Sequence, residues 1–484
     1  MHEQTFIGLL QNQLPAHCVL THPDELRPYE CDALSAYRQL PLVVVIPETL
    51  PQLQATVRLC AQHKVPVVAR GSGTGLSGGA MPLGNGVLLS LARFNRILEI
   101  DILNRIARVQ PGVTNLAISG AVASHGLYYA PDPSSQIACS IGGNVAENAG
   151  GVHCLKYGLT THNIQALKIL TIDGETLSIG GPALDSPGYD LLALLTGSEG
   201  LLGIIYEVTV KLLPKPATAQ VVLAAFESVD AAGAAVTATI ASGIIPAGLE
   251  LLDKPAIHAV RKFIDTGYPE DASAILLCEL DGSSEDVMAQ IERVSQVYRD
   301  AGATSLQVSR DEAERQRFWA GRKAAFPAMG RLSPDYYCMD GTIPRKHLAA
   351  VLNRITELSD EYGLPICNVF HAGDGNLHPL ILYDANKAGE LERTEELGGK
   401  ILELCVAVGG TITGEHGVGL EKINQMCVQF NTAELQQFHA VKQAFDPEAL
   451  LNPGKAIPTL HRCAEFGAMH VHHGQLPHPE LERF

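Results

Sequence analysis

Hydrophobic residues follow different spacings in successive parts of the chain. Residues 40–47 form a continuous apolar run, as buried strands do. Thr49 and Pro51 then open a segment whose apolar residues repeat on one helical face, which predicts a capped helix followed by a strand at 65–69. From there to about residue 215, short apolar runs alternate with glycine clusters, which predicts short strands joined by tight turns.

A second pattern begins after the proline-containing segment 212–216, where we expect a domain boundary. Residues 218–252 and 273–309 each have the pattern strand, helix, strand, and this repetition predicts a ferredoxin-like α+β domain. We therefore expect an α+β protein with domains at 1–215 and 216–445 and a C-terminal segment, 446–484, that returns to the first domain.

Composition and charge narrow the class of protein. The net charge of −17 argues against a general nucleic-acid binder, although a locally basic pocket can still take an anionic substrate. The 11 cysteines are irregularly spaced without CxxC, which predicts reduced thiols rather than a disulfide framework or an iron–sulfur site. No signal peptide and no apolar run of membrane-spanning length are visible, so we expect a cytoplasmic protein that attaches to a membrane only through a partner.

The first glycine-rich loop, at 70–79, contains Gly73, Gly75 and Gly78 in the spacing GxGxxG. In a Rossmann nucleotide site this motif leads directly into a helix. Here Pro82 and further glycines follow, which disfavours a helix and makes a nicotinamide-dependent enzyme a weak alternative.

Two more glycine-rich loops follow, at 140–151 and 196–204. Glycine lets backbone N–H groups approach a phosphate without interference from a Cβ atom. A single such loop would most simply be a sharp turn, but three predict one long cofactor lying along the backbone.

The strongest chemical signal is the segment HAGDGNLH at 371–378, in which a tight turn should bring His371 and His378 together. The segment GEHG at 414–417 adds Glu415 and His416. Two imidazoles and a carboxylate suit Zn²⁺, Mn²⁺, Fe²⁺ or Co²⁺ and leave room for substrate oxygens. The alternative is an inert, hydrogen-bonded histidine pair.

The glycine loops, with the segments 131–134 and 148–151, resemble the FAD-binding domain of the vanillyl-alcohol oxidase/p-cresol methylhydroxylase superfamily. The resemblance implies a two-part FAD-binding domain and, because the first loop lacks His and Cys, non-covalent FAD. The residues that it implies for FAD are Arg70, Gly71, Ser72, Gly73, Thr74, Gly75, Pro131, Asp132, Ser135, Gly142, Gly143, Asn144, Gly150, Gly203, Ile204 and Asn452.

Nearly the whole chain is similar to D-2-hydroxy-acid dehydrogenases, and segments 318–327 and 333–344 resemble their glycolate-oxidising members. This resemblance implies a Zn, Mn or Fe ion on His371, His378 and Glu415, a catalytic base at His416, and a substrate-carboxylate anchor at Arg322. Relatives that act on larger diacids carry a lysine where this chain has Cys338 or Met339, which favours a small substrate with one carboxylate.

The implied reaction is FAD-dependent oxidation of glycolate to glyoxylate, and of D-lactate to pyruvate, by proton abstraction and hydride transfer. The resemblance also implies a hetero-oligomer with a second FAD-binding subunit and an iron–sulfur subunit, and we expect the histidine-rich tail after residue 460 to dock a partner. Two alternatives remain: a D-lactate dehydrogenase of the same family, and a non-catalytic FAD-binding electron-transfer subunit.

Overall fold

The computed structural model describes residues 3–183, 187–459 and 482–483, so the histidine-rich tail predicted to dock a partner lies almost wholly outside the described residues. The chain forms two compact units, which we describe separately. Unit 1 comprises Met1–Gly150, Leu159–Pro214 and Glu415–Phe484, and unit 2 comprises Gly151–Gly158 and Lys215–Gly414. The chain thus re-enters unit 1 at Glu415, whereas we expected its return at 446.

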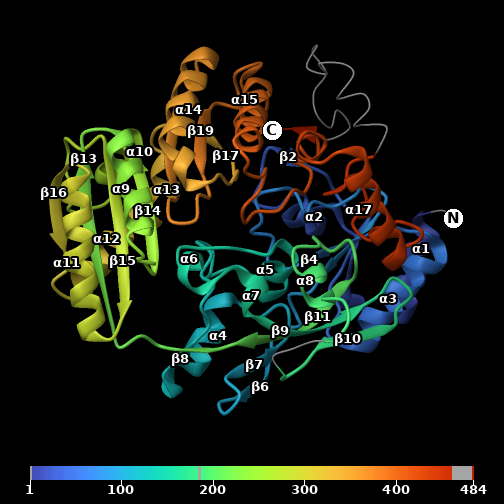
Figure 1. Ribbon diagram of the computed structural model, residues 1–484. Helices are drawn as coiled ribbons and strands as arrows, with labels where there is room; N and C mark the ends of the chain where they lie inside the picture. Colours follow the sequence, from blue (N-terminus) through green and yellow to red (C-terminus); the bar gives the residue numbers. More distant parts are fainter. Residues whose placement is uncertain (1–2, 184–186, 460–481, 484) are drawn as a thin grey trace. The chain divides into compact units, whose positions relative to one another are not determined.

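The first sheet of unit 1 is the predicted strand–helix–strand region (Figure 1). Its strands run in the order β1 (Val19–Leu20), β3 (Val43–Val45), β5 (Val87–Ser90) and β4 (Val67–Arg70), and β3, β5 and β4 are parallel. Helix α3 (Leu50–His63) joins β3 to β4, and the Thr49 side chain caps it in a capping box with Gln52. Residues 71–86, all of them described, contain no helix, so the first glycine loop is not a Rossmann loop.

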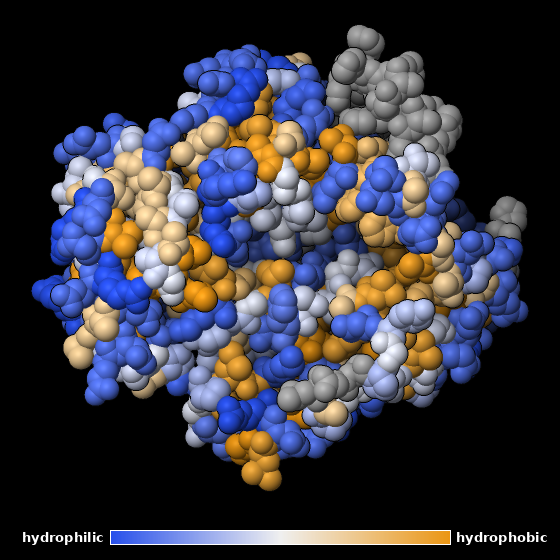
Figure 2. Space-filling view, in the orientation of Figure 1, coloured by the Kyte–Doolittle hydropathy of each residue, from blue (hydrophilic) through white to orange (hydrophobic). Residues whose placement is uncertain are grey.

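The second sheet of unit 1 is antiparallel and is formed by strands of the predicted glycine-rich region. It has a hydrophobic core separate from that of the first sheet. Its order is β10 (Thr176–Gly180), β9 (Ile164–Leu170), β11 (Ile204–Lys211), β7 (Ile106–Val109) and β6 (Ile97–Asp101). Helices α4 (Asn115–Val122) and α5 (Ile141–Glu147) bury Ile118 and Ile141 in this core. The β6–β7 turn exposes Ile102 and Leu103, and Figure 2 shows an orange projection at its lower edge where this turn lies.

Unit 2 is built on one seven-stranded antiparallel sheet in the order β16-β13-β15-β14-β18-β19-β17. Its first four strands have the strand order of a ferredoxin-like fold, as the repeated strand–helix–strand pattern predicted. The strands are β13 (Thr218–Phe226), β14 (Gly248–Asp253), β15 (Ala274–Gly282), β16 (Ala303–Val308), β17 (Asp335–Cys338), β18 (Ile366–His371) and β19 (Pro379–Tyr383).

Helices cover both faces of this sheet. Helices α9 (Val229–Ala241) and α11 (Ser284–Asp300) pack on one face, where Phe226 meets Tyr298 edge to face. Helices α10 (Lys254–Phe263), α12 (Glu312–Lys323) and α13 (Ala325–Met329) close a second core on the other face. Because strand side chains alternate, every second residue of β14, β15 and β18 points toward the face that α10, α12 and α13 cover.

Residues 151–158 belong to unit 2 because their side chains bind its sheet. Lys156 and Tyr157 both bond Asp281, with 2.6 Å between the Tyr157 hydroxyl and Asp281 Oδ2. His153 Nε2 lies 3.1 Å from Glu279 Oε1. The chain therefore passes from unit 1 to unit 2 at residue 151 and is back in unit 1 at residue 159.

None of the described helices is long and apolar enough to cross a bilayer. Nine of the cysteines in the described part of the chain are free thiols in this structure.

Candidate active site

The first two glycine loops meet directly in unit 1. Ser72 N–H donates to Ser140 Oγ at 3.2 Å, which joins the loop that follows β4 to the start of α5. Arg70 ends β4, is only 8% exposed, and donates to the Cys31 carbonyl at 2.6 Å. Gly73 has φ +72, and a Cβ there would overlap the Arg70 guanidinium, so glycine is required beneath this side chain.

Asn115, at the start of α4, ties two further predicted segments together. Its Nδ2 donates to the Pro131 carbonyl and to Asn144 Oδ1, both at 3.1 Å. Asp132 and Ser135 lie half-buried in the loop that continues from Pro131. We did not single out Asn115, because an asparagine at a helix start has an ordinary structural explanation.

The predicted glycines fall into two groups according to the space around them. A Cβ at Gly75 would meet nothing closer than 3.9 Å, and one at Gly143 nothing closer than 3.5 Å, so a side chain would clash with protein atoms at neither position. Gly142 instead packs on Pro111, and a Cβ at Gly203, just before Ile204 opens β11, would lie 2.8 Å from Ile169. Room beside the backbone at Gly75 and Gly143, in the first and second glycine-rich loops, is compatible with a cofactor that lies along these loops.

Asn452 connects the first glycine loop to the third. Its Nδ2 donates to the carbonyls of Gly79 at 3.0 Å and Glu199 at 2.7 Å. The buried Lys455 ammonium donates to Gly79 O at 3.1 Å, and burial lowers its pKa to about 7. Burial also raises the pKa of the nearby Asp32 carboxyl to about 6.

The segment that carries His416 is fastened to the same loops. Glu199 accepts the N–H of Val418 and the N–H of Gly419, both at 2.7 Å. A Cβ at Gly150 would lie against the Glu415 side chain, and Glu415 Oε1 is 3.6 Å from His416 Nε2. Within unit 1, the structure therefore brings His416 and Glu415 to the predicted FAD loops.

In unit 2 the tight turn after β18 brings the two predicted histidines together. The His371 and His378 rings meet edge to face with centroids 5.0 Å apart, and a nitrogen of one lies within 4.8 Å of a nitrogen of the other. Asp340 holds this hairpin through Asn376 Nδ2 at 2.9 Å, and its carboxylate also accepts the N–H of Gly414 at 3.1 Å. Asp340 therefore anchors both the histidine hairpin and the residue directly before Glu415.

Glu250 in β14 joins two predicted site residues. It lies opposite His371 in the β14–β18 pair, and its Oε1 is 2.7 Å from His371 Nδ1. Its Oε2 accepts from Arg322 Nε at 2.6 Å. Burial raises the pKa of Glu250, but the His371 and Arg322 charges and hydrogen bonds outweigh burial and leave that pKa below its usual value. Sequence reasoning missed this residue, which has leucine on both sides in the strand.

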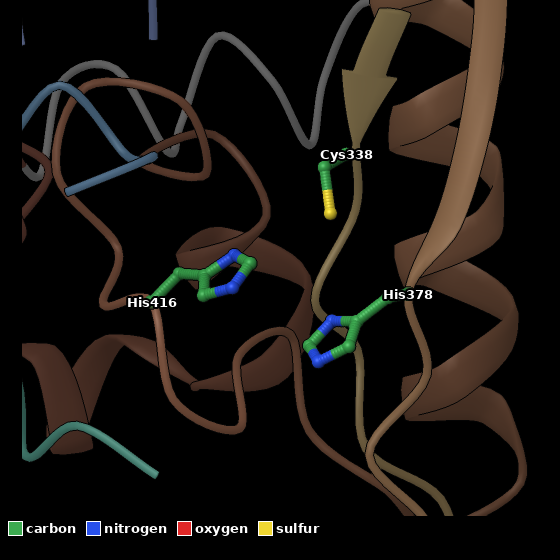
Figure 3. Close-up of side chains that lie close together, drawn as sticks. All are labelled: Cys338, His378 and His416. Atoms are coloured by element: carbon green, nitrogen blue, oxygen red, sulfur yellow. The ribbon is translucent and has the colours of Figure 1, made fainter. Parts of the chain in front are cut away.

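Cys338 lies beside His378 on the same face of the unit 2 sheet, opposite Leu380 in the β17–β19 pair (Figure 3). Its Sγ lies within 4.8 Å of a His378 ring nitrogen and donates to the Met339 carbonyl at 3.5 Å. Cys338 and its neighbour Met339 are the two residues at which we expected a lysine in relatives that act on diacids. His416, also drawn in Figure 3, belongs to unit 1.

The predicted chemistry is therefore distributed over both units. Unit 2 holds His371, His378 and Arg322, and unit 1 holds Glu415, His416 and the glycine loops. The peptide bond between Gly414 and Glu415 joins the two sets. Two adjacent imidazoles, one of them held by a carboxylate, have the donor chemistry of a divalent-metal site.

Two protein families match the chain. Residues 41–180 match the FAD binding domain, and residues 215–456 match the C-terminal domain of FAD linked oxidases. The first match contains the first two glycine-rich loops, and the second contains the histidine hairpin and the segment with His416.

Relatives match over nearly the full length. The chain is 66% identical over 475 residues to glycolate oxidase subunit GlcD of Escherichia coli (strain K12), covering 98% of this chain and 95% of that protein. Identity is 41% over 428 residues to glycolate oxidase subunit GlcD of Bacillus subtilis (strain 168), covering 88% and 91%. It is 33% over 434 residues to D-lactate dehydrogenase of Anaerostipes hadrus, again covering 88% and 91%.

Among solved structures, p-cresol methylhydroxylase with substrate bound has a TM-score of 0.78 at 18% identity, covering 95% of this chain and 97% of the other. This likeness confirms the predicted fold class. On the evidence of the two domain matches and the nearly full-length relatives, the chain belongs to the FAD-linked oxidoreductase family that includes glycolate oxidase subunit GlcD and D-lactate dehydrogenase.

Proposed function

We propose that this chain oxidises glycolate to glyoxylate, and D-lactate to pyruvate, with non-covalent FAD as the first electron acceptor. The observation that carries the proposal is Arg322. Its side chain is 3% exposed, and its Nη2 is buried without a hydrogen-bond partner among the described residues. A buried guanidinium with an unused donor is suited to bind the carboxylate of a small hydroxy acid.

The reaction needs a proton acceptor and a hydride acceptor. His416 would take the hydroxyl proton, because imidazole accepts protons near neutral pH. FAD, when bound, supplies the acceptor for the hydride from C2. Loss of that proton and that hydride converts the C2 hydroxyl to a carbonyl, which balances the oxidation.

We further propose that His371, His378 and Glu415 hold a Zn, Mn or Fe ion. The Glu250–His371 bond supports this, since metal-bound histidines usually donate their second N–H to a carboxylate. When bound, such an ion would acidify the hydroxyl of a 2-hydroxy acid. The remaining FAD contacts expected from the resemblance, from Arg70 to Asn452, are part of the same proposal.

The name of the Escherichia coli relative describes it as a subunit, which supports a hetero-oligomer for this chain as well. We propose a second FAD-binding subunit and an iron–sulfur subunit as its partners, in the cytoplasm or on the inner face of the membrane. A preference for D-lactate is the second candidate, because 33% identity to a D-lactate dehydrogenase favours it. The two substrates differ by one methyl group, which a pocket discriminates by only ~1–3 kcal/mol.

The test is anaerobic reduction of the flavin. The full chain, loaded with FAD and Mn²⁺ or Zn²⁺, is mixed with glycolate, D-lactate or L-lactate while the oxidised-flavin band is followed. Rapid bleaching by glycolate and D-lactate but not by L-lactate is expected, and the relative rates identify the preferred substrate.

The variant His416→Ala should keep FAD and lose this bleaching by ~100-fold or more, because the hydroxyl proton then has no acceptor. Wild-type rates in this variant would remove His416 from the reaction. Bound FAD that no hydroxy acid reduces would favour the non-catalytic electron-transfer subunit.

A further inference from the structure

Two buried groups with separate roles in the proposed function share one carboxylate. Glu250 Oε1 contacts His371 Nδ1 at 2.7 Å, and Glu250 Oε2 accepts from Arg322 Nε at 2.6 Å. The exposed fractions of the three side chains are 0% for Glu250, 3% for Arg322 and 4% for His371. Water therefore cannot replace either contact.

The contact with His371 fixes which ring nitrogen carries a proton. A carboxylate accepts, so Nδ1 must donate, and in the neutral ring the lone pair is then on Nε2. The hydrogen bond also sets the ring plane, because His371 lies opposite Glu250 in the β14–β18 pair and the two side chains meet within one sheet face.

The contact with Arg322 orients the other half of the site. Glu250 holds the Nε corner of the guanidinium, and Nη2 is buried without a partner among the described residues. The guanidinium is planar, so fixing one corner also fixes the direction in which Nη2 points. The negative charge of Glu250 also balances the positive charge of the buried Arg322 guanidinium.

We infer that Glu250 is a positioning residue that couples the metal ligand His371 to the substrate anchor Arg322. The inference rests on the proposed function and deepens it: the carboxylate makes metal affinity and hydroxy-acid affinity depend on one side chain that contacts neither ligand.

A matched control lies on the next strand. Glu279 in β15 is 4% exposed and likewise bridges a histidine, His153 at 3.1 Å, and an arginine of α12, Arg315 at 2.7 Å. Neither His153 nor Arg315 is a predicted site residue. Glu250→Gln and Glu279→Gln therefore remove equivalent buried charges, only one of which lies in the proposed site.

The experiment titrates Mn²⁺ into the FAD-loaded full chain without substrate, following free Mn²⁺ by electron paramagnetic resonance, and then measures the KM for glycolate at saturating Mn²⁺. A glutamine can accept from only one of the two donors. Glu250→Gln should therefore raise the Mn²⁺ dissociation constant ~10–100-fold and the glycolate KM ~10-fold or more. Glu279→Gln should change each by less than about threefold.

The outcomes separate the two proposals. A wild-type chain that neither binds Mn²⁺ nor is reduced by glycolate overturns the proposed function and with it the coupling. If the wild-type chain does both, two results overturn the coupling alone. In the first, the Mn²⁺ dissociation constant and the glycolate KM of Glu250→Gln lie within threefold of the wild-type values. In the second, Glu279→Gln raises both constants as much as Glu250→Gln does. If Glu250→Gln does not retain FAD, Glu250→Asp decides: it keeps the charge but cannot reach both partners, so unchanged Mn²⁺ binding in it also overturns the inference.

Discussion

Two carboxylates on adjacent strands of one sheet build similar clusters in unit 2. Glu250 joins His371 to Arg322, and Glu279 joins His153 to Arg315. Both arginines lie on α12, seven residues apart, and so face the sheet from the same side of the helix. Each cluster contains a glutamate, a histidine and an arginine. The clusters differ in how many of the arginine N–H groups have a hydrogen-bond acceptor.

In the Glu279 cluster, the arginine and the glutamate both make further hydrogen bonds. Arg315 also binds Glu312 through Nε at 2.7 Å and Nη2 at 2.8 Å, and the Trp319 indole donates to Glu279. The Glu250 cluster is more deeply buried, and yet Arg322 Nη2 has no partner in the described part of the chain. A buried donor without an acceptor costs stability, and under the proposed function the substrate carboxylate would supply the missing acceptor.

The largest difference between the clusters should appear when the histidines are removed. His371→Ala should slow flavin reduction by glycolate ~100-fold or more, because it removes a proposed metal ligand. His153→Ala should slow it less than about threefold. Stopped-flow bleaching of the flavin band measures both, and equal rates in the two variants would contradict the assignment of the site to the Glu250 cluster.

A smaller difference is expected between the arginines. Arg322→Lys keeps the charge but loses the planar fork, so the KM for glycolate should rise ~10–100-fold. Arg315→Lys should leave that KM within about threefold, since Arg315 contacts only protein groups. Steady-state kinetics with an artificial electron acceptor gives both values. A KM in Arg322→Lys that equals the wild-type value would mean that the substrate carboxylate binds elsewhere.

The smallest effect concerns stability against pH at the Glu279 cluster. Burial raises the pKa of Glu279, but the His153 hydrogen bond and the His153 and Arg315 charges outweigh burial and hold that pKa below the ordinary 4.5. A carboxyl with a lowered folded pKa stabilises the fold above about pH 4.5, and this contribution is lost as the pH falls through the folded pKa. Glu279→Gln should therefore be ~1–3 kcal/mol less stable than wild type at pH 7 and lose less further stability in acid.

Urea unfolding midpoints between pH 3 and pH 7 measure this effect. Glu285→Gln, on the exposed first turn of α11, serves as the control and should follow the wild-type curve. If the urea midpoint of Glu279→Gln falls as steeply between pH 7 and pH 3 as that of wild type, Glu279 does not titrate as its contacts indicate. Flavin reduction should be unaffected in both variants.

Local patterns in the sequence predicted much of the fold. Thr49, Pro51 and the apolar repeat after them predicted α3, and the two strand–helix–strand segments predicted the ferredoxin-like half of unit 2. The glycines and Asp374 predicted the turn that brings His371 and His378 together. Each of these features depends on residues within a few positions of one another, so neighbouring side chains suffice to specify it.

The residues that hold the site together were not predicted. Glu250, Asn115 and Asp340 are single polar residues among apolar or loop neighbours, and each has an ordinary explanation in its own segment. The expected return to unit 1 at 446 was placed too late for the same reason, because Glu199 holds Val418 and Gly419 from more than 200 residues away. Contacts of this range leave no periodic signal in the sequence.

The sequence by itself determined the elements, the turn chemistry and the types of residue available for catalysis. Only the tertiary structure decided that Glu250 meets His371, 121 positions away, and Arg322, 72 positions away, while Glu279 meets partners without a predicted role. The physical reason is strand register: side chains alternate across a strand, and a shift of one residue would have turned Glu250 to the opposite face of the sheet.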